Sequence, residues 1–461
     1  MRRILFAILG LLLLGDAAAL VAIDSGDASP LEWDPRVADL ARFVEDERHL
    51  RFDNPVDVRF LSEAEYQDET SEDSGALTEQ DKQDIANIEG EMRALGLIKN
   101  GVSLFDDQNA LLSGGTAAFY DPDADEMVIR GTEITIGLQV TLVHELTHAL
   151  QDQHFDLARE FDSDNRDVFF QALGEGDATR IENAYIDSLS DAKAEQYFDE
   201  ADALSDEATE AIEDVSPALT QLFAAPYELG EPLVSIVVDT KGVGDLDALF
   251  RNPPASDEGL MNPFALLDDA KPVKVARPKA KSREKVTDGG DFGGLTWYLT
   301  LASFIDEKVA LNATDGWGGD AFIGYRKNNR GCVRAHFVGD TPQDNHEMGA
   351  ALEQWRRAFQ SDAVSIAVTD KRVELDSCET DNAPAPRAGS DESLVLPIVR
   401  YQIAREVLAG GGTQRLARCA VNEYFSRFSF DQLTPETEAE GARLSSAGEQ
   451  IGRVCAQRGE V

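Results

Sequence analysis

Three residues between Thr141 and Phe155 have the types and the spacing that a catalytic metal site needs. The segment has helical periodicity, and His144 and His148 lie four residues apart within it. Residues four apart project from one face of an α-helix about one turn apart, so the two imidazoles can reach one ion. Glu145 lies beside them, where it can take a proton from a water that the ion activates. These residue types at this spacing predict a zinc site.

The neighbours of this short pattern favour a buried active-site helix over a surface helix. Three of the chain's six histidines (His144, His148 and His154) fall within eleven residues. The remaining helix faces carry apolar residues, which predict that the helix lies in a core: Leu142, Val143, Leu146, Ala149 and Leu150.

Two downstream residues compete for the position of the third metal ligand. His154 has the spacing of the metzincin branch of zinc proteases, which needs glycine where this chain has Gln151. With glutamine the helix is expected to continue, which carries His154 about 9 Å beyond His148 along the axis and off the ligand face. The alternative is Glu175, which opens a second helical pattern that runs to about Ile186. We favour Glu175 and keep His154 as the open alternative.

The histidine motif followed by Glu175 resembles the gluzincin branch of zinc metallopeptidases, the thermolysin-like enzymes. Compact members carry the downstream glutamate in an E-G-x-A sequence, which Gly176 and Ala178 match here. The resemblance implies an α+β fold, a zincin-like metalloprotease domain with a mixed sheet over the active-site helix. It also implies Zn2+ as the cofactor, a peptide or protein as the substrate and Glu145 as the general base.

The match to the family is incomplete around the ligands. Thr179 stands where thermolysin has an aspartate that orients a ligand histidine, so Asp177, Thr179, Glu182 and Asp152 are alternative supporting residues. Gluzincins also use a histidine or tyrosine to stabilise the oxyanion. Five residues qualify by type, and the sequence does not choose among them: Tyr185, Tyr227, Tyr298, His336 and His346.

A second hypothesis belongs to a different class of function. A zincin-like fold that has lost turnover would serve as an exported binding or scaffold protein. The intact set of motif residues argues against this hypothesis, because a relaxed site would tolerate their loss. Hydrolysis of a non-peptide amide is a third hypothesis, because the same chemistry allows it.

Composition excludes several classes of partner. The 461 residues include 86 Asp and Glu against 42 Lys and Arg, which gives a formal net charge of −44. Such a surface repels nucleic acid and anionic membranes, so we expect no nucleic-acid partner. Hydrophobic residues make up 43% of the chain, which is enough for a substantial core. The sequence does not define an oligomeric state.

The N-terminus has the pattern of a secretory signal. Two arginines precede an apolar run from Ile4 to Leu14, and small residues follow. Residues 1–22 are therefore predicted to be a signal peptide, which makes the protein secreted or extracytoplasmic. Asp16 interrupts the apolar run, so no stable membrane span is expected after cleavage, and an uncleaved anchor stays the alternative.

The four cysteines predict two disulfides in an exported chain. Three pairings are open, and we favour the two local ones, Cys332 with Cys378 and Cys419 with Cys455. Their spacing lacks the close pairs of a four-cysteine zinc site.

Composition also suggests the domain boundaries. A metallopeptidase domain is expected at 30–378, a linker rich in Ala and Pro at 379–391 and a helical C-terminal module at 392–461. Basic residues around Lys279 to Glu284 stand out in an otherwise acidic chain. The GWGGD segment at 316–320 is similar to segments of uncharacterised secreted proteins with the same histidine motif, and we favour a packing role for it.

Several strands are expected around the active-site helix. Val56 to Leu61 alternates as a strand does, and residues 117–121 and 126–130 form a hairpin that leads into the helix. One strand of this hairpin is expected to be the sheet edge to which a zincin binds its peptide. Val364 to Val373 is predicted to be one strand, and the segment from Pro226 to Leu249 is open between helix and strand.

Overall fold

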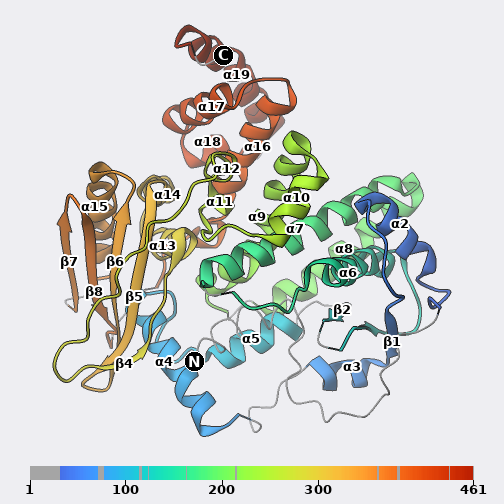
Figure 1. Ribbon diagram of the computed structural model, residues 1–461, viewed down its shortest axis with the longest axis horizontal. Helices are drawn as coiled ribbons and strands as arrows, with labels where there is room; N and C mark the ends of the chain where they lie inside the picture. Colours follow the sequence, from blue (N-terminus) through green and yellow to red (C-terminus); the bar gives the residue numbers. More distant parts are fainter. Residues whose placement is uncertain are drawn as a thin grey trace. The chain divides into compact units, whose positions relative to one another are not determined.

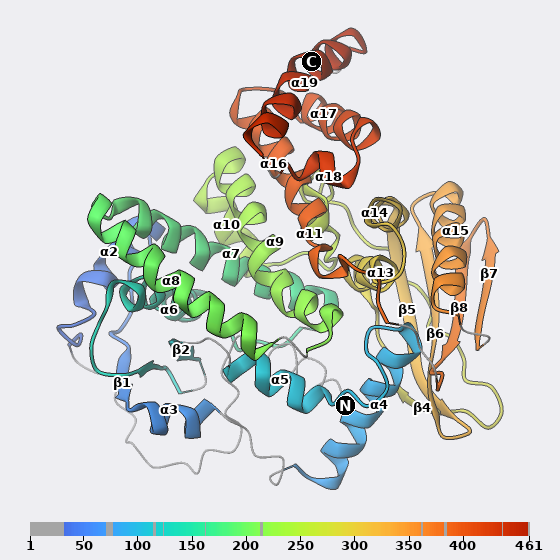
Figure 2. The same ribbon diagram turned by 180° about the vertical axis from the view of Figure 1, so that it is seen from behind.

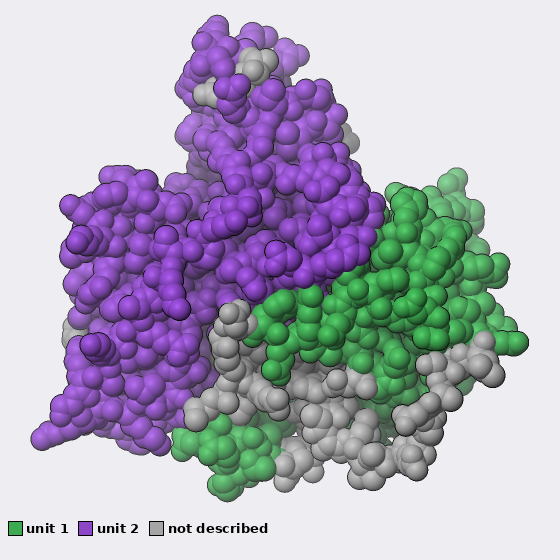
Figure 3. Space-filling view, viewed as in Figure 1, with its two compact units in different colours: residues 1–86, 102–161, 174–216 green, residues 87–101, 162–173, 217–461 purple. Residues whose placement is uncertain are grey.

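The protein is a mixed α+β structure. The computed structural model describes residues 32–70, 77–113, 117–122, 124–161, 163–212, 215–360, 363–381, 385–435 and 437–459, so the predicted signal peptide lies outside the described residues. Contacts divide the chain into two compact units (Figure 3). Unit 1 contains residues 1–86, 102–161 and 174–216, and unit 2 contains 87–101, 162–173 and 217–461. The predicted linker at 379–391 was inferred from composition and does not coincide with a boundary between these units. That domain division stays a prediction.

Unit 1 contains a three-stranded mixed sheet in the order β1-β3-β2 (Figure 1). Strand β1 (Asp57–Leu61) pairs in parallel with β3 (Glu126–Arg130), and β2 (Ala118–Asp121) pairs with β3 in antiparallel register. The predicted strand and the predicted hairpin are both confirmed. Since β3 lies in the centre, β2 is the hairpin strand that forms an edge of the sheet.

Helix α6 (Ile136–Phe155) carries the histidine motif through the core of unit 1. Thr135 caps its first turn by accepting a hydrogen bond from the Leu138 N–H at 3.2 Å. Its apolar side chains are fully buried, as predicted, in a cluster with residues of α2 (Ala38–Arg48) and of the sheet. The helix contacts α2, β2 and α8 (Asp191–Ala211), and unit 1 also contains α3 (Glu63–Thr70) and α5 (Leu104–Ser113).

Two long helices contribute residues to both units. Helix α4 (Glu79–Leu95) changes from unit 1 to unit 2 after Ala86, and α7 (Asp164–Ser188) changes from unit 2 to unit 1 after Leu173. Glu175 therefore lies on the part of α7 that belongs to unit 1, together with α6.

Unit 2 contains a five-stranded antiparallel sheet in the order β4-β5-β6-β8-β7. Its strands are β4 (Lys285–Asp288), β5 (Trp317–Lys327), β6 (Arg330–Gly339), β7 (Val364–Thr369) and β8 (Arg372–Cys378). The prediction of one strand over Val364–Val373 is wrong, because the chain turns at Asp370 and Lys371 and returns as β8. Helix α15 (Pro342–Ala358) packs against β6, β7 and β8 (Figures 1 and 2).

The segment left open between helix and strand is helical. It forms most of α9 (Pro217–Lys241) and of α10 (Val243–Arg251). The other helices of unit 2 are α11 (Glu258–Met261), α12 (Pro263–Leu267), α13 (Gly293–Ala302), α14 (Glu307–Thr314), η1 (Ser390–Glu392), α16 (Val395–Ala409), α17 (Gln414–Arg427), α18 (Phe430–Leu433) and α19 (Glu438–Gln457).

Both predicted disulfides are present. Cys332 and Cys378 face each other in the register of β6 and β8, and Cys419 and Cys455 join α17 to α19. Within the described part of the chain, no helix combines the length and apolar character needed to cross a membrane.

The GWGGD segment has the packing contacts that were predicted for it. It forms the start of β5, and its Asp320 side chain accepts hydrogen bonds from the Phe292 and Gly293 N–H groups and from the Trp297 indole N–H. Burial raises the pKa of Asp320 to about 7. The segment therefore holds the start of α13 against the sheet of unit 2.

A buried glutamate in unit 2 makes stability depend on pH. Burial and the Asp288 charge raise the pKa of Glu91 to about 8 from an ordinary value of 4.5. Gly324 leaves room for the carboxyl group, since a Cβ there would lie 1.8 Å from a Glu91 oxygen. Between these two pKa values the folded state keeps a proton that the unfolded state releases. The free energy of unfolding should therefore fall as pH rises from 4.5 to about 8.

Glu91→Gln is expected to stabilise the protein at pH 8 by about 1–3 kcal/mol and to change stability little near pH 4.5. The amide does not ionise, so the penalty for keeping a proton at high pH disappears. Urea unfolding at both pH values measures the difference. Glu79→Gln on the same helix is the control, because the Glu79 side chain is 94% exposed. An equal effect of both substitutions at pH 8 would contradict the assignment.

Candidate metal site

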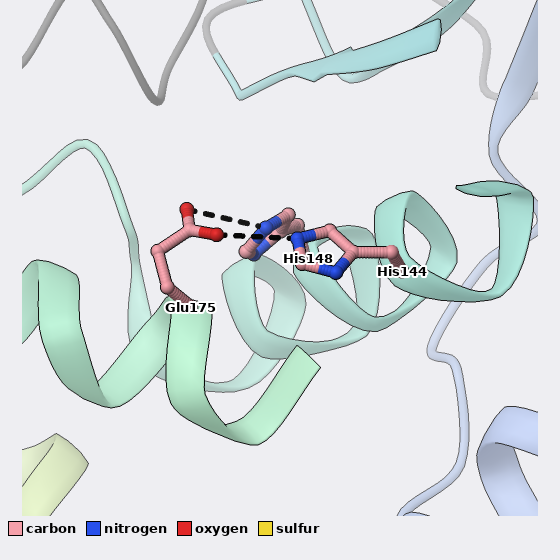
Figure 4. A group of neighbouring side chains, drawn as sticks. All are labelled: His144, His148 and Glu175. Atoms are coloured by element: carbon pink, nitrogen blue, oxygen red, sulfur yellow. Dashed lines mark hydrogen bonds and ion pairs between the residues drawn. The ribbon is translucent and has the colours of Figure 1, made fainter. Parts of the chain in front are cut away.

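His144, His148 and Glu175 converge in unit 1, as predicted (Figure 4). The Nε2 atom of His144 lies 3.1 Å from one carboxylate oxygen of Glu175, and the Nε2 atom of His148 lies 3.4 Å from the other. One ligand atom from each residue lies within 4.8 Å of the others. Their side chains are mostly buried, with 13%, 8% and 4% exposed in the same order. Three potential ligand atoms are thus held around one point.

Each histidine is oriented through its other ring nitrogen. The Nδ1 atom of His144 lies 2.9 Å from a Glu182 carboxylate oxygen, and the Nδ1 atom of His148 lies 3.1 Å from the Gln151 side-chain oxygen. Both partner atoms are acceptors, so each Nδ1 carries the proton and donates it. Without an ion, each Nε2 can donate a proton to Glu175, whereas a bound metal ion would take the place of that proton and leave Nδ1–H as the protonated nitrogen, which is the tautomer that metal binding requires.

A buried chain of polar groups fixes Gln151. Its amide N–H group donates to the Gly174 carbonyl at 3.0 Å and to the Asp177 carboxylate at 3.2 Å. Asp177 is paired in turn with Arg48 of α2 at 2.6 Å, and both side chains are fully buried. Because the amide nitrogen is committed to these two acceptors, the amide oxygen must face His148. Arg48 and Asp177 therefore orient the candidate ligand His148 indirectly, through Gln151.

Replacement of Gln151 by Met is expected to lower zinc affinity by about 10–100-fold, the usual effect of losing a hydrogen bond behind a ligand histidine. Methionine fills similar volume and leaves the His148 Nδ1–H without its acceptor. Competition with a chromophoric chelator measures the affinity. Gln153→Met is the matched control, because Gln153 lies on the same helix and bonds only the backbone around Asn54. Equal affinities for the two variants would contradict the proposed role.

The four supporting residues considered from sequence have different contacts. Glu182 contacts His144 directly, whereas Asp177 reaches His148 only through Gln151. Asp152 accepts a hydrogen bond from the Tyr120 hydroxyl at 2.9 Å, so it ties β2 to α6. Thr179 makes no side-chain hydrogen bond with any residue in the described ranges.

Glu145 lies beneath the edge strand of the sheet. One of its carboxylate oxygens accepts a hydrogen bond from the Tyr120 N–H of β2 at 3.0 Å. Burial raises the pKa of Glu145 above its ordinary value, although the charges of His148 and His144 oppose the rise. A carboxylate with a raised pKa accepts a proton more readily, which suits a general base.

The three converging residues form a tightly coupled charge cluster. Burial alone would lower the pKa of His144, but hydrogen bonds to Glu175 and Glu182 outweigh it and raise the pKa well above the ordinary value. Burial likewise opposes ionisation of Glu175, while the two histidines bring its pKa down to about 2. Glu175 therefore stays an anion throughout the neutral range, as a metal ligand must.

His154 lies apart from this cluster. Helix α6 continues to Phe155 through Gln151, as the absence of glycine predicted. His154 Nε2 lies 2.8 Å from the Arg51 carbonyl oxygen, and His154 does not belong to the metal-binding group found among the described residues. The geometry thus favours Glu175 over His154 as the third ligand.

The residues considered as oxyanion donors have partners elsewhere. Tyr185, the only one of the five in unit 1, donates its hydroxyl to Gln139 at 3.0 Å. In unit 2, Tyr298 donates to the Ser393 carbonyl, His336 lies 3.0 Å from the Ala276 carbonyl, and His346 pairs with Asp370. Tyr227 also lies in unit 2.

Sequence reasoning missed two polar residues near the cluster. Gln151 was considered only for its effect on the helix, although its position three residues after His148 places it on the same face. Tyr197 of α8 was not considered, and burial together with the nearby Glu182 charge raises its pKa. No pattern in the acidic segment around Tyr197 marks this phenol as different from an exposed one.

The donor set suits zinc. A tetrahedral zinc ion with bonds of about 2.0–2.1 Å holds its ligand atoms roughly 3.3 Å apart. The separations of 3.1 and 3.4 Å between the histidine nitrogens and the Glu175 oxygens are close to this value, although they involve different oxygens, and one ligand atom from each residue lies within 4.8 Å of the others. Two imidazoles and one carboxylate leave a fourth position open, which is typical of catalytic rather than structural zinc sites.

No protein-family model, curated protein or solved structure matches this chain.

Proposed function

We propose that the protein is an exported zinc metallopeptidase of the gluzincin type, with a zincin-like arrangement in unit 1. One observation supports this most strongly: both His Nε2 atoms face Glu175 while both Nδ1 atoms donate to fixed acceptors. A structural pair of core histidines has no need for two separate supporting acceptors and a shared carboxylate.

In this proposal His144, His148 and Glu175 would hold the zinc ion. Zinc there would supply Lewis acidity, which makes a water a stronger acid and polarises a carbonyl group. Glu145 takes the proton from the attacking water and returns it to the leaving amine. The Tyr120 N–H keeps the Glu145 carboxylate oriented between these two steps.

Strand β2 is the proposed binding site for the peptide backbone. Its pairing partner among the described strands is β3 alone, so its other edge has no strand partner there, although the Tyr120 N–H on that edge donates to Glu145. The Arg130 N–H donates to the Ala117 carbonyl, which in antiparallel alternation turns the backbone groups of residues 118 and 120 away from β3. An extended peptide added at this edge would lie beside Glu145.

The proposal is tested by incubating purified protein with an unfolded protein substrate, beside a Glu145→Gln variant. Cleavage by the parent and not by the variant supports a peptidase. A parent that binds zinc tightly and cleaves no peptide or simple amide would instead support the exported binding or scaffold protein.

A further inference from the structure

The segment 271–285, here called the basic strap, concentrates positive charge in an acidic chain. It contains seven Lys and Arg residues and one carboxylate, Glu284. The whole chain has 42 such cations in 461 residues, or about 1.4 in 15, so the strap holds about five times the average. Figure 1 shows it as the long irregular stretch that leads from α12 to β4 beside the five-stranded sheet of unit 2.

The backbone of the basic strap is fixed against the sheet. The Val273 N–H donates to the Gly318 carbonyl at 2.7 Å, and a Cβ at Gly319 would lie 2.4 Å from the Val273 oxygen. Further along, His336 Nδ1 lies 3.0 Å from the Ala276 carbonyl oxygen, and Arg334 donates to the Lys279 carbonyl at 3.0 Å. Residues of β5 and β6 thus hold the strap at several points.

A buried ion pair secures the end of the strap. Arg334 makes two hydrogen bonds to Glu284, at 2.8 and 2.9 Å, while the Glu284 side chain is fully buried. Lys281 is bound as well, to Asp376 at 2.9 Å. Burying charged groups costs free energy unless they are well paired, so this pair commits the only carboxylate of the strap to a structural contact.

Five strap cations remain without a counter-charge. They are exposed, and none has a carboxylate within ion-pair distance among the described residues: Lys274, Arg277, Lys279, Arg283 and Lys285. Arg277 and Lys279 flank the buried Pro278, so both face outward. Arg277 and Lys279 lie two residues apart, Lys274 precedes Arg277 by three residues, and Arg283 lies in a turn with a φ of 70°, so the five cations do not share one extended face. The strap therefore gathers five exposed cations without a counter-charge on a backbone that β5 and β6 hold in place.

We propose that the basic strap is a docking site for a linear polyanion of the polyphosphate or sulfated-polysaccharide type, and nucleic acid stays excluded as a partner. A local concentration of like charges is unfavourable by itself and becomes favourable when an opposite charge lies beside it. Arginine and lysine bind the oxygens of phosphate and sulfate through charge-assisted hydrogen bonds. The inference concerns unit 2 and does not depend on the proposed peptidase activity.

The residues around these cations favour a linear polymer over a bilayer. Proteins that lie on bilayers usually insert aromatic or large aliphatic side chains beside their basic residues. The strap contains no aromatic residue, and the exposed apolar residues at its ends are only Val273 and Val286. The net charge of −44 also opposes a broad anionic surface, while charges beyond about 8 Å are largely screened from a thin chain at physiological salt.

The test measures binding of the full mature chain to labelled inorganic polyphosphate and to heparin over a range of salt concentrations. The strap variant replaces the five unpaired cations with Gln. The matched control replaces five other exposed cations without ion pairs, which lie on separate elements, so the net charge changes equally: Lys99, Lys193, Lys371, Arg415 and Arg443. A third variant exchanges Lys and Arg within the strap and keeps every charge.

The parent, the control and the charge-preserving variant should bind, with a slope of log affinity against log salt of about −3 to −4 for five contacts. The strap variant should lose this binding while it melts at the parent temperature. The proposal would be overturned if the parent binds neither polymer. It would also be overturned if the control variant loses as much binding as the strap variant. Tighter binding to vesicles containing phosphatidylglycerol would assign the strap to a membrane instead, and tighter binding to polyglutamate would assign it to an acidic protein.

Discussion

Replacing Glu145 with Gln is expected to lower kcat for peptide hydrolysis by about 10²–10⁴-fold, the usual contribution of a general base. The glutamine oxygen can still accept the hydrogen bond that the Tyr120 N–H now gives to Glu145. It does not accept a proton at neutral pH. Because Glu145 is not among the three converging residues, bound zinc should be unchanged. The initial rate of peptide hydrolysis and the zinc content are measured on the same sample.

Glu133→Gln is the control for this change, because it removes one exposed carboxylate just before the same helix. It should keep the parent rate. A Glu145→Gln variant with full zinc content and the parent kcat would show that another group accepts the proton. A variant that loses zinc would place Glu145 among the ligands and would contradict the division of roles proposed here.

Replacing Arg48 with Met is expected to reduce the free energy of unfolding by about 3–5 kcal/mol, the usual cost of removing one partner from a buried ion pair. Asp177 would lose the guanidinium that lies 2.6 Å away and, with no exposure to water, would keep only Arg180 among the described residues as a charged partner, at 3.0 Å. The Asp177 carboxylate also holds Gln151, so zinc affinity should fall in the same variant. Urea unfolding at neutral pH measures the stability.

Arg36→Met provides the comparison, because Arg36 pairs with Asp34 at the surface and its side chain is 45% exposed. Exposed pairs of this kind contribute about 0–1 kcal/mol. Equal losses from the two substitutions would mean that the buried pair adds no more than a surface pair. A double variant that also replaces Asp177 with Leu should recover part of the loss, because the fully buried carboxylate is then gone, while Arg180, which loses its partner, has a side chain that is 16% exposed.

Helical periodicity made the centre of the site predictable. Spacing of four residues placed His144 and His148 on one face, and glutamine at position 151 predicted that α6 continues past the motif. The same arithmetic applies to α7, where Glu182 follows Glu175 by seven residues and so returns to the same face after two turns. One helix therefore supplies the third ligand and the partner of His144, and local sequence contains this information.

Contacts between distant segments could not be predicted in this way. Arg48 reaches Asp177 across 129 positions, and no local pattern links the end of α2 to α7. The rotamer of Gln151 depends on that pair, so its contact with His148 was also hidden. The hairpin was predictable from alternation, but the identity of the edge strand was not, because it depends on the distant β1 pairing with β3.

The division into units shows a second limit. The boundary at 379–391 stays a prediction from composition, while the contact units divide the chain inside helices instead. The helices α4 and α7 supply residues to both units, and continuous helical periodicity gives no signal where such a change occurs. The hairpin of β7 and β8 was similarly missed, because the turn at Asp370 and Lys371 lacks the glycine that usually marks a two-residue hairpin turn.

Zinc per chain in the purified mature protein, measured by elemental analysis, tests the central claim most directly. Glu175→Ala and His154→Ala variants are measured beside the parent. We predict one zinc ion in the parent and in His154→Ala, and its loss in Glu175→Ala. Loss in His154→Ala alone, or a parent that takes up no zinc when it is supplied, would contradict the site built from His144, His148 and Glu175.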